Sequence, residues 1–73
     1  MPQIDDIKAS LALAIKMARV ERDVTQTDLE RLSGVSQSVI SYIELGKSAP
    51  KIDTLIKIAD GLGKKVVIRL EDA

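Results

Sequence analysis

The stretch Thr25–Gly46, TQTDLERLSGVSQSVISYIELG, decides the fold. It predicts two short helices joined by a tight turn at Gly34, a residue that readily takes the left-handed backbone at a helix end. Thr25 is an N-cap residue type, and Asp28 in the first turn suits the positive end of the helix dipole. Ser36 is the N-cap of the second helix. The stretch therefore offers one short helix held at a fixed angle to its neighbour.

Further helices are expected on both sides of this pair, which gives an all-α fold class. The helices are predicted at residues 5–23, 26–33, 37–45 and 52–62. The first has an apolar stripe at helical spacing, formed by Ile4, Ile7, Leu11, Ile15 and Ala18. Its second, partly apolar face (Leu13, Met17, Val20) either covers the edge of the core or meets a partner. The residues expected to be buried in the other three are Leu29, Leu32, Val39, Ile40, Ile43, Leu55, Ile58, Ala59 and Leu62.

The C-terminal segment changes character. Residues 64–70, KKVVIRL, follow Gly63 and are rich in β-branched residues, which predicts a strand at 65–70. One strand cannot satisfy its own backbone, and nothing else in the chain resembles a strand. We therefore expect it to pair with the same segment of a second copy, so that a homodimer forms. The dimerisation residues would be Val66, Val67, Ile68 and Leu70. The alternative is a tail whose apolar side chains rest on the core.

Composition excludes several function classes. At 73 residues the chain is one small domain. It has no cysteine and no histidine, so disulfides, thiolate metal sites and the commonest catalytic base are absent. The carboxylates show no paired spacing, so we expect no enzyme, no metal and no cofactor. No apolar run is long enough to span a membrane and no signal peptide pattern is present, which predicts a cytoplasmic protein without a membrane partner.

The helix at 37–45 carries the chemistry. With Val39, Ile40 and Ile43 buried, helical geometry leaves five side chains outward: Gln37, Ser38, Ser41, Tyr42 and Leu45. Glutamine can bond an adenine edge twice, serine can serve several bases, and tyrosine can contact a thymine methyl or a phosphate. Gln26 opens the preceding helix beside free backbone N–H groups, a common way to bind phosphate, and Lys47 and Lys51 can neutralise further phosphates. Net charge is zero and does not favour nucleic acid, so this local pattern alone predicts double-stranded DNA as the partner.

One family combines these features. The pattern Thr25-Gln26…Leu29…Ser33-Gly34-Val35-Ser36-Gln37-Ser38-Val39-Ile40-Ser41…Ile43-Glu44…Gly46-Lys47…Pro50…Thr54-Leu55…Ile58-Ala59…Leu62-Gly63 resembles the helix-turn-helix domain of the phage repressor and Cro family, also called the xenobiotic-response-element type. The match covers residues 15–63. The resemblance implies a bundle of four or five helices. It also implies a transcriptional repressor that binds a palindromic operator as a homodimer, with its third helix in the major groove.

The resemblance also implies roles by position. Gln37, Ser38 and Tyr42 match the base-reading residues, with Ser36 and Ser41 secondary. Gln26 and Lys47 match phosphate contacts. Arg19 and Glu44 match a structural pair that joins the first helix to the end of the recognition helix.

Two positions depart from the family pattern. Glu30 stands where alanine is usual, so its side chain must bend outward or find a partner near Arg31 or a lysine. Gly61 replaces a better helix former and should fray the fourth helix. The Leu-Gly-Lys-Lys ending is similar to that of antitoxin members, which implies an alternative function: an antitoxin that neutralises a protein toxin and represses its own operon.

Overall fold

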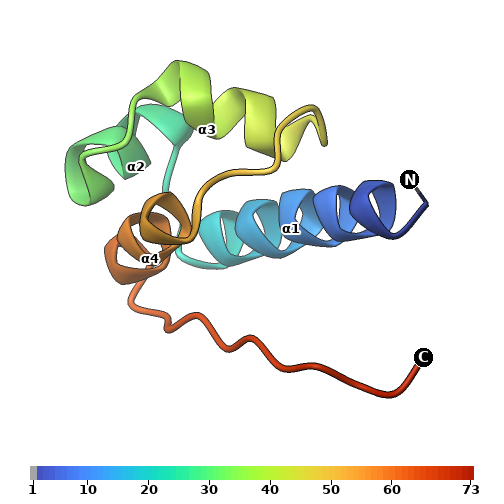
Figure 1. Cartoon of the computed structure of the whole chain (residues 1–73). Helices are drawn as coiled ribbons and strands as arrows, with labels where there is room; N and C mark the ends of the chain where they lie inside the picture. The colour runs from blue at the N-terminus through green and yellow to red at the C-terminus, as the bar shows by residue number, and fades with distance from the viewer. Residues whose placement is uncertain (1) are drawn as a thin grey trace.

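Residues 2–73, which the computed structural model describes, form four α-helices in the order α1 (Pro2–Glu21), α2 (Gln26–Ser33), α3 (Gln37–Glu44) and α4 (Ile52–Gly61). In Figure 1, α2 and α3 lie above the long helix α1, and α4 packs near the C-terminal end of α1. The closest pairings of helices are α2 with α4, α1 with α3, and α2 with α3. No helix among residues 2–73 combines the length and the apolar composition needed to cross a bilayer.

A small aliphatic core lies where the four helices meet. Leu29, Ile40 and Ile43 are fully buried, and Ile58 and Leu62 are almost so. Ile15 of α1 and Val35 of the turn complete the cluster. Each helix therefore contributes one or two side chains to a single centre, which fixes α3 against both α1 and α2.

Local capping sets the start and end of α2. The Thr25 hydroxyl accepts the backbone N–H of Asp28 at 3.0 Å, and the Asp28 carboxylate accepts that of Thr25 at 3.1 Å. The hydrogen bond from the Thr25 backbone lowers the pKa of the Asp28 carboxyl below its ordinary value. At the other end, Gly34 has φ of 77° and its N–H bonds to the Glu30 carbonyl. A residue with a Cβ is strained in this left-handed conformation, so glycine sets the angle between α2 and α3.

Gly61 lies at the contact between α2 and α4. Its low helix propensity, from which fraying of the fourth helix was expected, gives no indication of this contact. A Cβ at this position would lie 3.1 Å from the Ser33 Cβ and 3.3 Å from Leu29 Cδ1. The missing side chain lets the two helices approach closely.

Several positions expected in the core are instead partly exposed. Leu32 is 48% exposed and Val39 40% exposed, because both lie beside rather than on the buried face of their short helices. Ile4 and Ile7 are similarly open, since they lie in the part of α1 distant from α4 (Figure 1). The second face of α1, Leu13, Met17 and Val20, is exposed.

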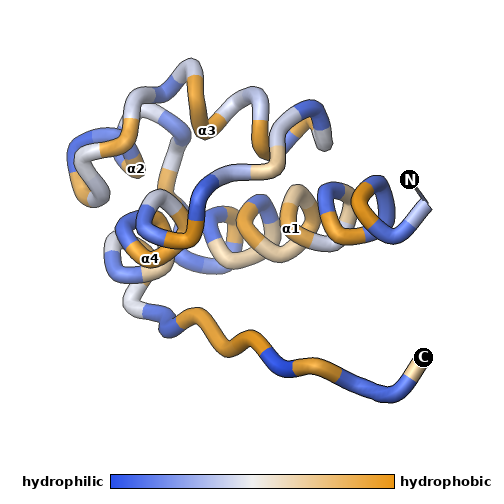
Figure 2. Tube along the Cα trace, in the orientation of Figure 1, coloured by the Kyte–Doolittle hydropathy of each residue, from blue (hydrophilic) through white to orange (hydrophobic). Residues whose placement is uncertain are grey.

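The predicted C-terminal strand is wrong. Residues 64–73 have no regular structure and run as an extended segment below α1 (Figure 1). Backbone groups of a strand need a neighbouring strand, and residues 2–63 contribute only helices and their connections. The segment nevertheless keeps its apolar character outside the helical core (Figure 2): Val67, Ile68 and Leu70 are 74%, 63% and 99% exposed.

Candidate nucleic-acid interface

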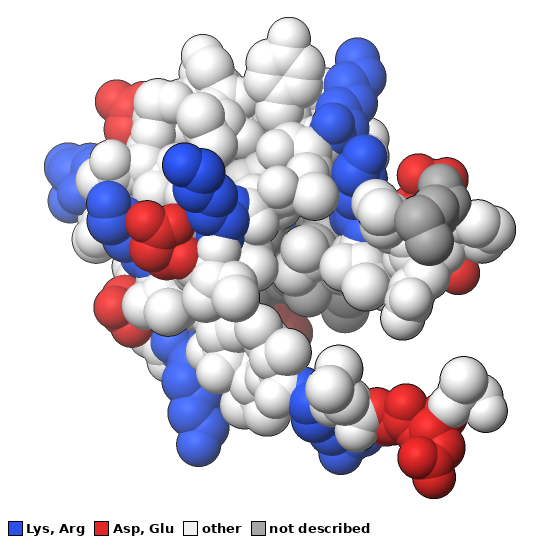
Figure 3. Space-filling view, viewed as in Figure 1, with Lys and Arg blue, Asp and Glu red and all other residues white. Residues whose placement is uncertain are grey.

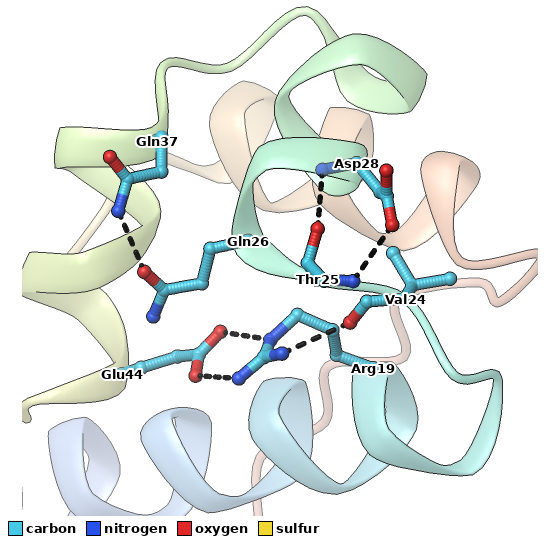
Figure 4. Close-up of polar contacts among 7 residues, drawn as sticks. All are labelled: Arg19, Val24, Thr25, Gln26, Asp28, Gln37 and Glu44. Atoms are coloured by element: carbon cyan, nitrogen blue, oxygen red, sulfur yellow. Dashed lines mark hydrogen bonds and ion pairs between the residues drawn. The ribbon is translucent and has the colours of Figure 1, made fainter.

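A nearly buried ion pair fixes α3 to α1. Arg19 Nε and Nη2 donate to the two carboxylate oxygens of Glu44, each at 2.9 Å. The third bond runs from Arg19 Nη1 to the Val24 carbonyl at 3.0 Å (Figure 4). The Arg19 side chain is 15% exposed and that of Glu44 5%. The bond to Glu44 also raises the pKa of Arg19. One residue from α1 thus holds both the last residue of α3 and the segment that leads into α2.

The opposite end of α3 is held by α2. Gln37, the first residue of α3, donates its side-chain Nε2 to Oε1 of Gln26 at 2.9 Å, and both residues open their helices (Figure 4). The Gln37 side chain is exposed, yet this bond gives it a defined direction. Two amides from different helices therefore form one polar unit on the surface.

The Glu30 carboxylate binds the backbone of Gln37. Its Oε1 accepts the N–H of Gln37 at 2.6 Å. Glu30 does not pair with Arg31, which was one of its expected partners. Instead, Arg31 Nη2 lies 3.8 Å from Oδ1 of Asp28. In the sequence, Glu30 is only a departure from the family pattern. A partner seven residues away, across a turn, is determined by how α2 and α3 pack.

The outer face of α3 forms a shallow hollow of about 350 Å³. It is lined by Gln37, Ser38, Ser41, Tyr42, Leu45 and Lys47. Tyr42 is 58% exposed and Leu45 64% exposed, so the two project at its rim. In Figure 3, uncharged atoms cover the surface over α3, with basic side chains on its right and an acidic side chain on its upper left. The face offers amide and hydroxyl groups without any charge in its centre.

The remaining expected site residues lie outside this hollow. Ser36 caps α3, where its hydroxyl accepts the N–H of Val39 at 3.3 Å. Lys51 precedes α4 as its N-cap residue and is exposed. Five of the predicted DNA-contacting residues thus lie together on α3 and just beyond its C-terminal end. Gln26 is joined to them by its hydrogen bond to Gln37. Ser36 and Lys51 do not line the hollow.

Comparison with known proteins gives one consistent family. A family model described as helix-turn-helix matches residues 15–68. An HTH-type transcriptional regulator of Haemophilus influenzae is 35% identical over 63 residues, which cover 86% of this chain and 64% of that protein. Multiprotein-bridging factor 1c of Arabidopsis thaliana is 33% identical over 63 residues, which cover 86% of this chain and 43% of that protein. The chain therefore spans less than two thirds of the length of these relatives.

Solved structures agree. An HTH_3 family transcriptional regulator from Vibrio cholerae superposes with a TM-score of 0.83 at 35% identity, over 85% of this chain and 35% of that one. A toxin–antitoxin module from Streptococcus pneumoniae superposes with a TM-score of 0.72 at 36% identity, over 90% of this chain and 73% of that one.

Proposed function

Because the chain belongs to the helix-turn-helix family, we propose that it is a sequence-specific DNA-binding transcriptional regulator that represses from a palindromic operator. The observation that carries the proposal is the outer face of α3. Its centre has hydrogen-bonding groups and no charge, and Gln37 is already oriented by Gln26. Such a face suits base edges in a major groove about 12 Å wide.

The roles of the individual residues follow from their chemistry. Gln37 reads an adenine, Ser38 and Tyr42 contact neighbouring bases, and Ser36 and Ser41 add secondary contacts. Gln26, Lys47 and Lys51 bind phosphates on either side of the groove. In this arrangement the Arg19–Glu44 pair holds the reading helix at a constant angle to the rest of the domain.

Binding should depend steeply on salt. With two lysines on each of two copies, the plot of log affinity against log salt should have a slope of about −3.6, at about 0.9 for each phosphate neutralised. Affinity for a duplex that the protein selects from a random-sequence library should then fall on the order of 100-fold between 50 and 200 mM salt. Fluorescence anisotropy at four salt concentrations measures the slope. A flat dependence would refute phosphate binding by these residues, and Lys16→Ala, a change in α1, should leave the slope unaltered.

We also propose that the regulator acts as a homodimer, joined through the exposed apolar side chains of the C-terminal segment. A groove of about 490 Å³ runs between α1, α4 and this segment, lined mainly by apolar side chains such as Leu11, Met17, Leu55 and Val66. In Figure 1 the segment lies below α1 whereas α3 lies above it, so this surface and the reading face can be used together. Two reading helices would then contact half-sites about 34 Å apart.

The dimer predicts a change in mass. Sedimentation should give twice the mass of one chain, and the double substitution Ile68→Asp with Leu70→Asp should give one chain, because buried unpaired carboxylates are costly. Ile52→Asp is the matched control, since Ile52 is an exposed isoleucine at the start of α4. A double variant that keeps the double mass would exclude this surface as the dimer contact.

A second candidate is favoured by the likeness to the Streptococcus pneumoniae toxin–antitoxin module: an antitoxin that binds a protein toxin and also represses its own operon. A toxin would use the folded surface, for which the exposed apolar face of α1 formed by Leu13, Met17 and Val20 is available. If a neighbouring reading frame stops growth when expressed alone and fails to do so when this chain is co-expressed, the antitoxin function is supported. If no neighbour has this effect, the simple repressor stands.

A further inference from the structure

We propose that Glu30 is a specificity-determining residue of the DNA-reading face, because its carboxylate occupies the N-terminus of α3 and keeps phosphates away from it. The inference rests on the proposed DNA binding and adds a residue that acts through charge rather than through a base contact.

The first observation is the contact itself. Glu30 Oε1 lies 2.6 Å from the backbone nitrogen of Gln37, the first residue of α3. The Ser36 hydroxyl takes the N–H of Val39, two residues further on. Two of the N–H groups that a helix leaves free at its start are therefore already satisfied by the protein. One of the two acceptors carries a full negative charge, at the positive end of the helix dipole.

Second, without Glu30, the N-terminus of α3 would be open to phosphate. Free N–H groups and the dipole make an uncovered helix N-terminus a ready site for phosphate. A reading helix that bound phosphate at its first turn would bind any duplex. Here the site holds the protein's own carboxylate, which repels an approaching phosphate and leaves α3 to contacts with uncharged base edges.

The third observation is that the same residue is held twice. α2 accepts the backbone N–H of Gln37 through Glu30, and it accepts the Gln37 side chain through Gln26. Both the position and the direction of Gln37 are thus set before DNA arrives. Glu30 is a positioning residue for Gln37 and, through its charge, a residue that discriminates against non-specific DNA.

Two substitutions separate these effects. Glu30→Gln keeps an oxygen acceptor for Gln37 and removes the charge, whereas Glu30→Ala removes both. Asp6→Asn is the matched control: Asp6 is an exposed carboxylate of α1 that does not line the groove beside the C-terminal segment, and the same net charge is lost. Affinities are measured at 50 and 200 mM salt for two 30-base-pair duplexes, one selected by the wild-type protein from a random library and one of scrambled sequence.

With Glu30→Gln, affinity for the scrambled duplex should rise about 3- to 10-fold at 50 mM salt, and the gain should shrink at 200 mM because salt screens the repulsion. Affinity for the selected duplex should rise less, so the specificity ratio falls. Glu30→Ala should in addition lose affinity for the selected duplex, because Gln37 is no longer held. Asp6→Asn should match the wild type.

The possible failures are distinct. If Glu30→Gln and the wild type bind both duplexes equally, Glu30 is only a structural cap and the inference is wrong. If the wild type binds no duplex, the proposed function itself fails. Thermal unfolding of each variant by circular dichroism shows that the affinities are those of folded protein.

Discussion

Replacing Arg19 with alanine is expected to lower the free energy of unfolding by about 3–5 kcal/mol. The substitution removes both hydrogen bonds that the Glu44 carboxylate accepts from Arg19, and it leaves that carboxylate, which is 5% exposed, without a partner among the described residues. It also frees the Val24 carbonyl. Small domains have total stabilities of about 5–15 kcal/mol, so this loss is a large share of the free energy of unfolding. Urea unfolding followed by circular dichroism measures the loss.

Two control variants make the result specific. Arg31→Ala removes an exposed pair with a 3.8 Å separation and should cost less than about 1 kcal/mol. The double variant Arg19→Met with Glu44→Leu should recover most of the loss, because apolar residues of similar size can replace a buried pair. If Arg19→Ala were no more destabilising than Arg31→Ala, the pair would not fix α3.

Replacing Gln37 with alanine is expected to relax specificity at one base pair of each half-site. A glutamine that bonds an adenine edge twice contributes about 1–3 kcal/mol of discrimination, hence about 2–6 kcal/mol over two symmetric half-sites. The scrambled duplex should be bound as before, because no phosphate contact is lost. Competition titrations against duplexes changed at single positions locate the base pair.

Lys47→Ala should behave in the opposite way. It should weaken binding to every sequence alike and make the salt slope shallower by about 1 for each copy. Gln3→Ala, an exposed glutamine in α1, should change neither quantity. Identical behaviour of the Gln37 and Lys47 variants would show that the division between base reading and phosphate binding is wrong.

Much of this fold is predictable from the sequence because its signals are local. Thr25 and Asp28 cap α2 within one turn, and Gly34 ends it through its own backbone freedom. Ser36 caps α3 in the same way. Burial is predictable only where periodicity is unambiguous. Ile40 and Ile43 are buried as expected, whereas Val39, one position away, lies at the edge of an eight-residue helix.

The C-terminal segment shows where local signals fail. β-branched residues favour an extended backbone, and residues 64–73 are extended, but a strand exists only when another strand accepts its hydrogen bonds. Composition could indicate the conformation and could not supply the partner.

The sequence by itself determined α2 and α3, their N-caps and the polar, uncharged composition of the outer face of α3, because each depends on residues within a turn of one another. The start of α1 at Pro2, three residues before the predicted Asp5, was not determined in this way. Only the tertiary structure decided which groups meet: Glu30 with the backbone of Gln37, Gln26 with its side chain, and Gly61 with Ser33. These contacts join different helices across 7, 11 and 28 residues, and their existence depends on the angle and depth at which the helices pack. Packing of this kind is a property of the whole core and cannot be read from any one stretch, not even Thr25–Gly46.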